Sequence, residues 1–307
     1  MEKINLLRES IASSFVGKEN IVNNMLVALL SGGHVLIEDV PGVGKTTLAK
    51  AISDSVAADF RRIQCTPDTL PTDIIGTSIY NTKTAQFEVM KGPVFCQIFL
   101  ADEINRTSPK CQSALLEAME EHQVTIDGNT FKLPDPFMVI ATQNPTEQVG
   151  TYPLPEAELD RFMMKLSVGY PNMEMESLLA KKYLSGELKQ KTEPVLTSDD
   201  IVKIKEEVRN VLIKDEVIEY ALTIVERSRK LEELEYGLSP RAGLDLLMAS
   251  KAEAYLHERD FVVPEDVINM AKITLPHRLV LTTKSRMSKY TGYQIIIEII
   301  DKVKRPS

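Results

Sequence analysis

The chain has 307 residues, of which 43% are hydrophobic and 26% are charged, and its formal net charge is −8. This length allows two domains with their own cores, while the acidic balance argues against a protein that binds nucleic acid. No stretch approaches the roughly 18 consecutive apolar residues of a membrane helix, and the N-terminus lacks a signal-peptide pattern, so we expect a cytoplasmic protein.

Five largely apolar runs with the character of β-strands recur in the first half of the chain. Such continuous runs are typical of parallel strands that helices cover on both faces. Helical patterns lie at 21–30, 46–58 and 108–121, and the last one opens with Ser108 and Pro109, a favourable helix start. The sequence therefore predicts a three-layer α/β domain. The expected strands are 34–38, 60–65, 97–101, 137–142 and 162–168.

Two hairpin patterns interrupt this alternation, and each lies within an insert between expected strands. The second contains Asp127-Gly128-Asn129, a strong signal for a tight turn. The hairpin strands are expected at 78–80 with 86–89 and at 123–126 with 130–133, within inserts near 66–92 and 123–133.

Beyond about residue 170 every segment is predicted to be helical, and the helix starts at Ser198 and Pro264 carry acids in their first turns. Apolar stripes at helical spacing are expected to form the core of this part. We therefore expect an α/β domain over 1–170 and a smaller all-α domain over 171–307. The predicted stripes are Val217, Ala221, Ile224, Val225 and Ser228 on one helix, and Leu244, Leu247, Met248 and Lys251 on another.

Residues 38–47 combine the features of a phosphate-binding loop. An apolar strand runs into a loop that contains Gly42 and Gly44, and the loop opens directly into a helical pattern. In such a loop the backbone N–H groups surround a phosphate, the helix N-terminus adds a positive dipole, and Lys45 supplies a full charge. Asp39 stands where the general motif has its first glycine, so its carboxylate must point away from the phosphates.

A second strand end predicts a metal ligand and a water-activating group. The apolar run 98–101 carries two adjacent carboxylates, Asp102 and Glu103, to the sheet edge at which open α/β folds bind ligands. Neighbouring residues of a strand point to opposite faces, so the two acids are expected to have different roles. Asp102 would hold Mg²⁺ together with the Thr46 hydroxyl, and Glu103 would orient or deprotonate the attacking water.

Three further residues complete the predicted site. Asn144 follows an expected strand, where its amide either lies between the γ-phosphate and the attacking water or simply ends the strand before a proline. Arg161 precedes the last strand, and Arg241 lies in the first turn of a predicted helix. A cation in that turn opposes the helix dipole, so a phosphate partner would explain it, and pairing with a nearby acid is the alternative.

The three cysteines, Cys65, Cys96 and Cys111, are an odd number without C-x-x-C spacing. Few histidines lie near them in the sequence, and the chain has four histidines in all. We therefore expect reduced, mostly buried thiols rather than metal ligands.

Taken in order, these motifs resemble the AAA+ ATPases, and within them the MoxR family. The similarity covers nearly the whole chain, and several blocks are specific to that family rather than general to phosphate-loop proteins. It implies a nucleotide-binding α/β domain with a helical lid, with ATP held between them and at a subunit boundary, usually in a hexameric ring. The matching blocks are 32–38, 101–106, 115–121, 124–128, 140–145, 159–162 and 238–241.

The resemblance also implies a role for each site residue, with ATP and Mg²⁺ as cofactors. Asp102 and Glu103 match the Walker B motif, and Asn144 matches sensor 1. Arg161 resembles an arginine finger that is presented to a neighbouring subunit, and Arg241 resembles sensor 2, acting on the nucleotide of its own subunit or of the neighbour. The Walker A motif, which would bind the phosphates, is matched by Pro41, Gly42, Val43, Gly44, Lys45, Thr46 and Thr47.

The family resemblance favours an ATP-driven, chaperone-like remodeller that acts with protein partners, among them proteins with a von Willebrand factor A domain. A nucleic-acid motor or loader is one alternative, since helicase relatives share the inserts, but the acidic hairpin tip at 127–129 argues against it. A nucleotide-sensing scaffold is another, although a sensor does not need water activation. A further hypothesis is that Gln64 or Thr66 restrains Glu103 until a client binds.

Overall fold

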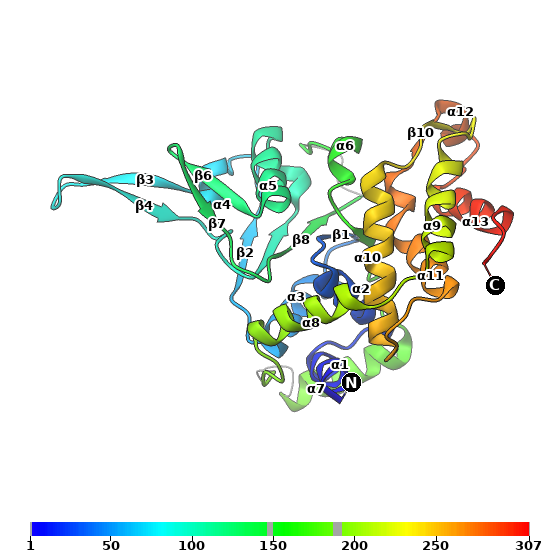
Figure 1. Ribbon diagram of the computed structural model, residues 1–307. Coiled ribbons are helices and arrows are strands. Elements are labelled where there is room, and N and C mark those ends of the chain that lie inside the picture. The colour runs from blue at the N-terminus through cyan, green and yellow to red at the C-terminus, as the bar shows by residue number, and fades with distance from the viewer. Residues whose placement is uncertain (1, 146–149, 187–191, 307) are drawn as a thin grey trace. The chain divides into compact units, whose positions relative to one another are not determined.

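The computed structural model describes residues 2–145, 150–186 and 192–306 (Figure 1). Contacts between Cα atoms divide the chain into two compact units, which we call the sheet unit and the helical unit. The segment that contains Arg161, Pro155–Lys165, is grouped with the C-terminal helices. The domain boundary that we predicted near residue 170 stays a prediction. The sheet unit comprises Met1–Val22, His34–Leu154 and Leu166–Val202, and the helical unit comprises Asn23–Gly33, Pro155–Lys165 and Lys203–Ser307.

A five-stranded sheet has the strand order β2-β5-β8-β1-β9. The pairs β2–β5, β5–β8 and β1–β8 are parallel, as the continuous apolar runs predict. β5 and β8 are buried along nearly their whole length, whereas β2 is an edge strand with several exposed side chains. All five predicted strands are confirmed, with small shifts at their ends. They are β1 (Val35–Glu38), β2 (Phe60–Gln64), β5 (Ile98–Asp102), β8 (Met138–Gln143) and β9 (Met164–Leu166).

The register brings the carboxyl ends of neighbouring strands together at one edge of this sheet. Gln64 lies opposite Asp102, and Glu38 lies opposite Gln143. The chain therefore leaves the sheet at this same edge in the phosphate loop, after β5 and after β8. This is the edge at which parallel α/β sheets bind their ligands.

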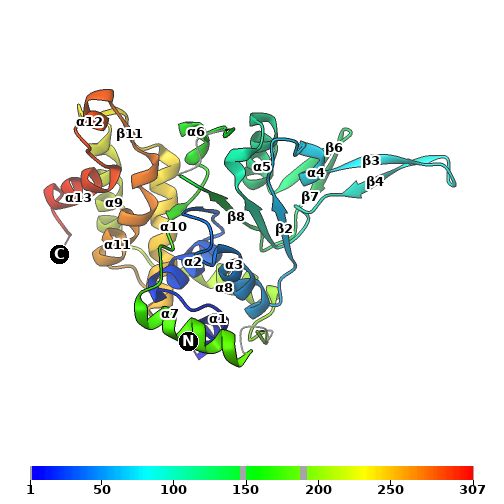
Figure 2. The ribbon, with the colours of Figure 1, turned by 180° about the vertical axis from the view of Figure 1, so that it is seen from behind.

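The helices predicted at 21–30, 46–58 and 108–121 are confirmed. α3 begins directly after the phosphate loop and packs against β5 and α1 (Figure 2). α5 begins after an extended Ser108 with Pro109 at its first position, where the missing N–H of proline costs no hydrogen bond. The first helices are α1 (Glu2–Ser14), α2 (Glu19–Ser31), α3 (Lys45–Ser55), α4 (Pro71–Ile75), α5 (Pro109–Glu121), α7 (Met173–Ser185) and α8 (Ser198–Asn210).

Both predicted hairpins are present as antiparallel pairs. Gly76 has a φ of +100°, and a Cβ there would lie 2.2 Å from the carbonyl oxygen of Met90, so this position accepts only glycine. The β3–β4 hairpin extends away from the rest of the sheet unit (Figure 1), and its Tyr80 and Phe87 are exposed. The hairpin strands are β3 (Gly76–Asn81), β4 (Gln86–Lys91), β6 (Gln123–Ile126) and β7 (Asn129–Lys132).

Helices α9, α10, α11 and α13 form the core of the helical unit. The predicted stripe on α9 is confirmed, since all five of its residues are buried. A short antiparallel pair, β10 with β11, is an element that the sequence did not predict. The elements of this unit are α6 (Glu156–Leu159), α9 (Asp215–Ser228), β10 (Leu234–Tyr236), α10 (Pro240–Leu256), α11 (Pro264–Thr274), η3 (Pro276–Arg278), β11 (Val280–Leu281), α12 (Thr283–Met287) and α13 (Gly292–Lys302).

The predicted stripe on α10 is wrong. Leu244, which belongs to that stripe, is 64% exposed, whereas Ala242, Leu246 and Ala249 are fully buried. α10 packs against α9 and α11 mainly through small side chains, which let the helix axes approach closely. A search for large apolar residues at helical spacing therefore selects the wrong face of this helix.

Cys65, Cys96 and Cys111 are buried and form no disulfide, as predicted. Burial raises the pKa of the Cys65 and Cys96 thiols to about 12, so both stay protonated. Within the described residues, no three His, Cys, Asp or Glu side chains are grouped as a metal site would require. None of the described helices has the length and apolar character needed to span a membrane.

Candidate active site

The phosphate loop joins β1 to α3 through residues 39–44. Gly42 and Gly44 have φ angles of +85° and +89°, in the left-handed region that glycine adopts without strain. A Cβ at Gly42 would meet no atom within 4 Å, so the backbone conformation rather than crowding favours glycine there. The first turn of α3 contains no acidic residue, which leaves its N–H groups and dipole to act on an anion.

Lys45 is the first residue of α3, and its Nζ donates to the backbone carbonyl of Asp39 at 2.8 Å. The ammonium group therefore lies across the loop, close to the loop's first residue. A full positive charge and the N–H groups of the helix start are thus placed side by side, as phosphate binding requires.

The side chain of Asp39 is turned towards the segment that follows β9. Its Oδ2 accepts hydrogen bonds from the Gly169 N–H at 2.6 Å and from the Ser167 hydroxyl at 3.1 Å, and its Oδ1 accepts from the Val40 N–H at 2.9 Å. Asp39 is 7% exposed. The acid that replaces the first glycine of the motif therefore ties the loop to residues 167–169, which explains why this departure is compatible with a phosphate loop.

Replacing Asp39 should lower the stability of the protein, even when the new residue is the glycine that the general phosphate-loop motif has at this position. Asp39→Gly removes the acceptor of the Gly169 N–H, so we expect the free energy of unfolding to fall by about 1–3 kcal/mol. Urea denaturation measures this, with Asp68→Ala as control because Asp68 is exposed. An Asp39→Gly protein as stable as the wild type would show that the contacts with Ser167 and Gly169 contribute nothing.

Asp102 ends β5 and is 9% exposed. Its Oδ1 accepts from the hydroxyl of Thr142 at 2.5 Å, and its Oδ2 accepts from the guanidinium of Arg62 at 2.7 Å. Thr142 lies on β8 and Arg62 on β2, so both neighbouring strands position this carboxylate. A carboxylate held in this way is the ligand type that Mg²⁺ prefers.

Glu103 has a φ of +57°, a left-handed conformation that is uncommon outside glycine and that clusters at functional sites. Its N–H donates to the Thr142 hydroxyl at 2.9 Å, so one hydroxyl contacts both adjacent acids. The Glu103 carboxylate pairs with Arg106 at 3.3 Å, whereas Asp102 bonds to Arg62. The two acids thus have different surroundings, in line with the different roles predicted for them.

Asn144 follows β8 and is 4% exposed. Because β8 lies between β5 and β1, the chain leaves the sheet there between the two acids and the phosphate loop. The preceding Gln143 donates to the carboxylate of Glu38 at 2.6 Å, which links the ends of β8 and β1. This position suits an amide that contacts both a terminal phosphate and an attacking water, and the role of Asn144 stays a prediction.

The sequence reasoning missed Arg62 and Thr142 as partners of the two acids. An available signal was the pair Arg61-Arg62 inside an expected strand, since charged residues seldom occupy strands covered on both faces. Gln64 also contacts this arginine, because its side-chain oxygen accepts from Arg62 at 2.9 Å. The hypothesis that Gln64 or Thr66 restrains Glu103 stays untested.

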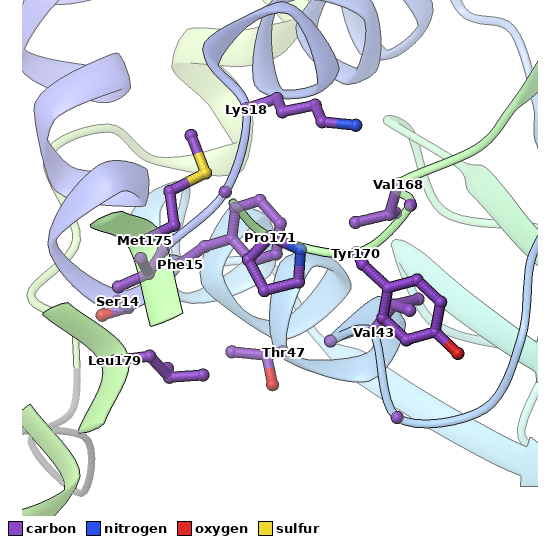
Figure 3. A pocket seen from close by; sticks show the side chains of 15 residues that line it. Ser14, Phe15, Lys18, Val43, Thr47, Val168, Tyr170, Pro171, Met175 and Leu179 are labelled. Atoms are coloured by element: carbon purple, nitrogen blue, oxygen red, sulfur yellow. The ribbon is translucent and has the colours of Figure 1, made fainter. Parts of the chain in front are cut away.

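A cavity of about 260 Å³ adjoins the phosphate loop and was also missed. Figure 3 shows the side chains that line it, which come from the end of α1 and the segment after it, from the phosphate loop and the start of α3, and from the segment after β9 and from α7. Most are apolar, so the cavity suits the flat apolar faces of a nucleotide base rather than its phosphates. The lining includes Phe15, Val16, Gly17, Lys18, Val43, Thr47, Tyr170, Pro171, Met175 and Leu179.

Arg161 and Arg241 both belong to the helical unit. Asp160, the neighbour of Arg161, accepts hydrogen bonds at 3.1 and 2.9 Å from the hydroxyl of Ser239. Ser239 is the N-cap residue of α10, and Arg241 lies in the first turn of that helix. A single pair of side chains therefore links the segment of one predicted arginine to the helix of the other.

Two residues of η3, the half-buried His277 and the buried Arg278, hold the same segment. His277 and Arg278 each donate to the carbonyl oxygen of Phe162 at 2.9 Å, and Arg278 also bonds to Asp245 of α10 at 2.6 Å. Burial and, next, the charge of Arg278 lower the pKa of His277 to about 3, so its imidazole is neutral and donates through Nε2. The backbone beside Arg161 is therefore held in place by several contacts.

Comparison with known proteins decides the family. Residues 34–164 match the model of the ATPase family associated with various cellular activities (AAA), and residues 226–299 match the AAA lid domain. The Chaperone MoxR1 of Mycobacterium tuberculosis is 42% identical to this chain over 95% of the chain and 79% of its own length. The chain belongs to the MoxR family of AAA+ ATPases.

Two further proteins are similar to this chain over nearly its whole length. YeaC of Bacillus subtilis is 49% identical over 97% of this chain and 93% of its own length. A crystal structure of a Cytophaga hutchinsonii protein, 39% identical, matches with a TM-score of 0.93 over 100% of this chain and 96% of its own. The predicted α/β core with a helical lid is thereby confirmed.

Family membership confirms that this MoxR protein is an ATPase, and AAA+ ATPases bind nucleotide and typically assemble into oligomeric rings. In the terms of this family, the loop is predicted to be the Walker A motif, and Asp102 with Glu103 is predicted to form the Walker B motif. The sheet edge brings together the loop, both acids and Asn144, whereas Arg161 and Arg241 lie in the other unit. The individual roles of these residues stay predictions.

Proposed function

We propose that this MoxR-family ATPase couples ATP hydrolysis to chaperone-like remodelling or maturation of partner proteins. The observation that carries this proposal is the convergence of the phosphate loop, Asp102, Glu103 and Asn144 at one sheet edge. A protein that only sensed nucleotide would not need an acid poised for water activation. The relative named Chaperone MoxR1 supports the chaperone-like part of the proposal.

In this proposal the backbone N–H groups from Gly42 to Thr47 surround the β- and γ-phosphates after Pro41, which has no N–H, and Lys45 leaves the Asp39 carbonyl to neutralise their charge. Glu103 orients or deprotonates the water that attacks the γ-phosphorus, and Asn144 aligns this water with its amide. The γ-phosphoryl group passes to water, which yields ADP and inorganic phosphate. The cavity beside the loop receives the adenine base.

The residues present fit Mg²⁺, which prefers oxygen ligands and retains several of its waters. Thr46 offers a hydroxyl in the first turn of α3, and Asp102 offers a carboxylate that Thr142 holds in place. We assign the ion to these two residues, with Asp102 acting through a water molecule. When bound, Mg²⁺ neutralises charge on the β- and γ-phosphate oxygens.

Two parts of the proposal concern assembly. A hexameric ring would place Arg161 of one subunit at the nucleotide of the next, as an arginine finger, while Arg241 acts on its own nucleotide or the neighbour's. A protein with a von Willebrand factor A domain is the proposed partner class. The exposed apolar side chains on the β3–β4 hairpin, Tyr80 and Phe87, offer a surface for a client or partner.

The nucleotide assignment is tested with two lysine variants of one helix. We expect Lys45→Ala to weaken ATP binding at least tenfold, because it removes the full positive charge that the phosphate loop itself places on the β- and γ-phosphates. Lys50→Ala, on the exposed face of α3, should bind like the wild type. Isothermal titration calorimetry with ATP and Mg²⁺ measures both affinities. Equal affinities for the two variants would remove Lys45 from the site.

The partner class is tested by measuring ATP turnover with added macromolecules. Stimulation by a von Willebrand factor A domain protein encoded beside this chain would support the remodelling function. Stimulation by single-stranded DNA, without a response to any protein, would instead favour a nucleic-acid motor.

A further inference from the structure

Arg62 on the edge strand β2 makes a contact that the proposed reaction does not use. Its Nη2 donates to Oδ2 of Asp102 at 2.7 Å and to Oε1 of Gln64 at 2.9 Å. Gln64 lies directly opposite Asp102 in the β2–β5 register. Arg62 lies two residues before Gln64 on β2, so the side chains of Arg62 and Gln64 point to the same face of the sheet. The arginine therefore reaches the Walker B aspartate from the neighbouring strand.

This contact occupies the aspartate that we assign to the metal. The other oxygen of Asp102 accepts from Thr142, so the carboxylate has a partner on each oxygen. The Asp102 side chain is 12% exposed, which limits screening of the ion pair by water. A guanidinium stays charged at every working pH, so the pair persists until another cation replaces Arg62.

We propose that Arg62 competes with Mg²⁺ for Asp102 and thereby raises the magnesium concentration that nucleotide binding and hydrolysis require. The inference rests on the proposed function, in which Asp102 is a metal ligand. Arg62 occupies the Asp102 oxygen to which a magnesium-bound water would donate, and two cations this close together repel each other. Arg62 is thus a positioning residue: it orients the Asp102 carboxylate and would have to leave it for Asp102 to act on the metal.

The strand also provides a place for the displaced side chain. The side-chain amide oxygen of Gln64, Oε1, already accepts from Arg62, so the guanidinium retains one hydrogen bond when it leaves Asp102. Arg62 is 45% exposed and can turn towards water without burying its charge. Displacement therefore requires a rotation of one side chain and no movement of the sheet.

The same strand offers a matched control. Arg61 is the adjacent residue, points to the opposite face of β2, and pairs with Asp59 at 3.3 Å. Its side chain is 44% exposed, almost the same as that of Arg62. Arg61→Ala and Arg62→Ala thus remove the same charge from the same strand, and only the second one frees Asp102.

The test is the magnesium dependence of nucleotide binding in the full-length protein. A fluorescent ADP analogue is titrated at a series of free Mg²⁺ concentrations, and its affinity is also measured in EDTA. We expect Arg62→Ala to lower the half-saturating Mg²⁺ concentration roughly ten- to a hundredfold, the range of one lost charge-assisted hydrogen bond. Arg61→Ala, and Arg62→Lys, which keeps the charge, should stay close to the wild-type midpoint, and no variant should change the affinity in EDTA.

Two results would overturn this inference. One is an unchanged magnesium midpoint in Arg62→Ala with nucleotide binding intact, which would make the ion pair a passive contact. The other is a raised midpoint, which would mean that Arg62 assists metal binding. Should Arg62→Ala misfold, Arg62→Gln keeps a polar side chain at this position and removes the charge, and the same criteria apply to it. Loss of magnesium-dependent binding in the wild type as well would instead refute the proposed function.

Discussion

Glu103→Gln should bind ATP as tightly as the wild type and hydrolyse it at least a hundredfold more slowly. The amide keeps the shape of the side chain but cannot accept a proton from the attacking water, and positioned general bases contribute about 10²–10⁴ in rate. Phosphate release under saturating ATP measures turnover, and calorimetry measures affinity. The exposed Glu216→Gln on α9 provides a variant with the same charge change away from the site.

The same variant bears on the remodelling function. An enzyme that binds ATP without hydrolysing it should stay in the ATP-bound state and retain its protein partner on a column, whereas Lys45→Ala should not. Turnover of Glu103→Gln within threefold of the wild type would show that another group activates the water. The strained backbone at Glu103, with its φ of +57°, would then need a different explanation.

Arg161→Ala should lower turnover by about 10³-fold or more without changing ATP affinity. An arginine finger stabilises charge that develops on the phosphoryl group in the transition state, and in other phosphate-loop enzymes it contributes 10³–10⁵ in rate. The contacts of Asp160 and of the Phe162 carbonyl support the role, because they hold the backbone on both sides of Arg161. Turnover per subunit should also fall when wild-type protein is diluted to monomers.

Mixing distinguishes a finger in trans from one in cis. Glu103→Gln subunits retain Arg161, and Arg161→Ala subunits retain an intact hydrolytic site, so mixed rings should regain part of the activity that each variant lacks alone. Arg305→Ala, an exposed arginine in the helical unit, should be active alone. If mixtures stay inactive, or if demonstrably monomeric wild type turns over at the assembled rate, the assignment of Arg161 is wrong.

The sequence was sufficient for the local parts of the site because their signals are local. Gly42 and Gly44 mark a backbone that must adopt positive φ, and the apolar run before Asp102 marks a buried strand that ends in acids. Both depend on residues within ten positions of each other. The five strands, both hairpins and the buried stripe of α9 are recognisable for the same reason.

The predictions from sequence were wrong or incomplete where a feature depends on contacts between residues that are far apart in the chain. On α10 the pattern pointed to Leu244, but close packing between α9, α10 and α11 buries the face with small side chains. Asp39 was expected to turn aside, and only the fold shows its partners, Ser167 and Gly169. Likewise, nothing near Phe15 in the sequence connects it with Tyr170 across one cavity.

The sequence by itself therefore determined the family, the phosphate loop and the identity of the acids, because each follows from residue types at fixed short spacings. Only the tertiary structure decided what surrounds them: Thr142 shared between Asp102 and Glu103, Arg62 on the carboxylate of Asp102, and the apolar cavity beside the loop. Strand order is the physical reason. β2, β5 and β8 become neighbours through pairing between segments far apart in the chain, and short-range patterns carry no information about such pairing.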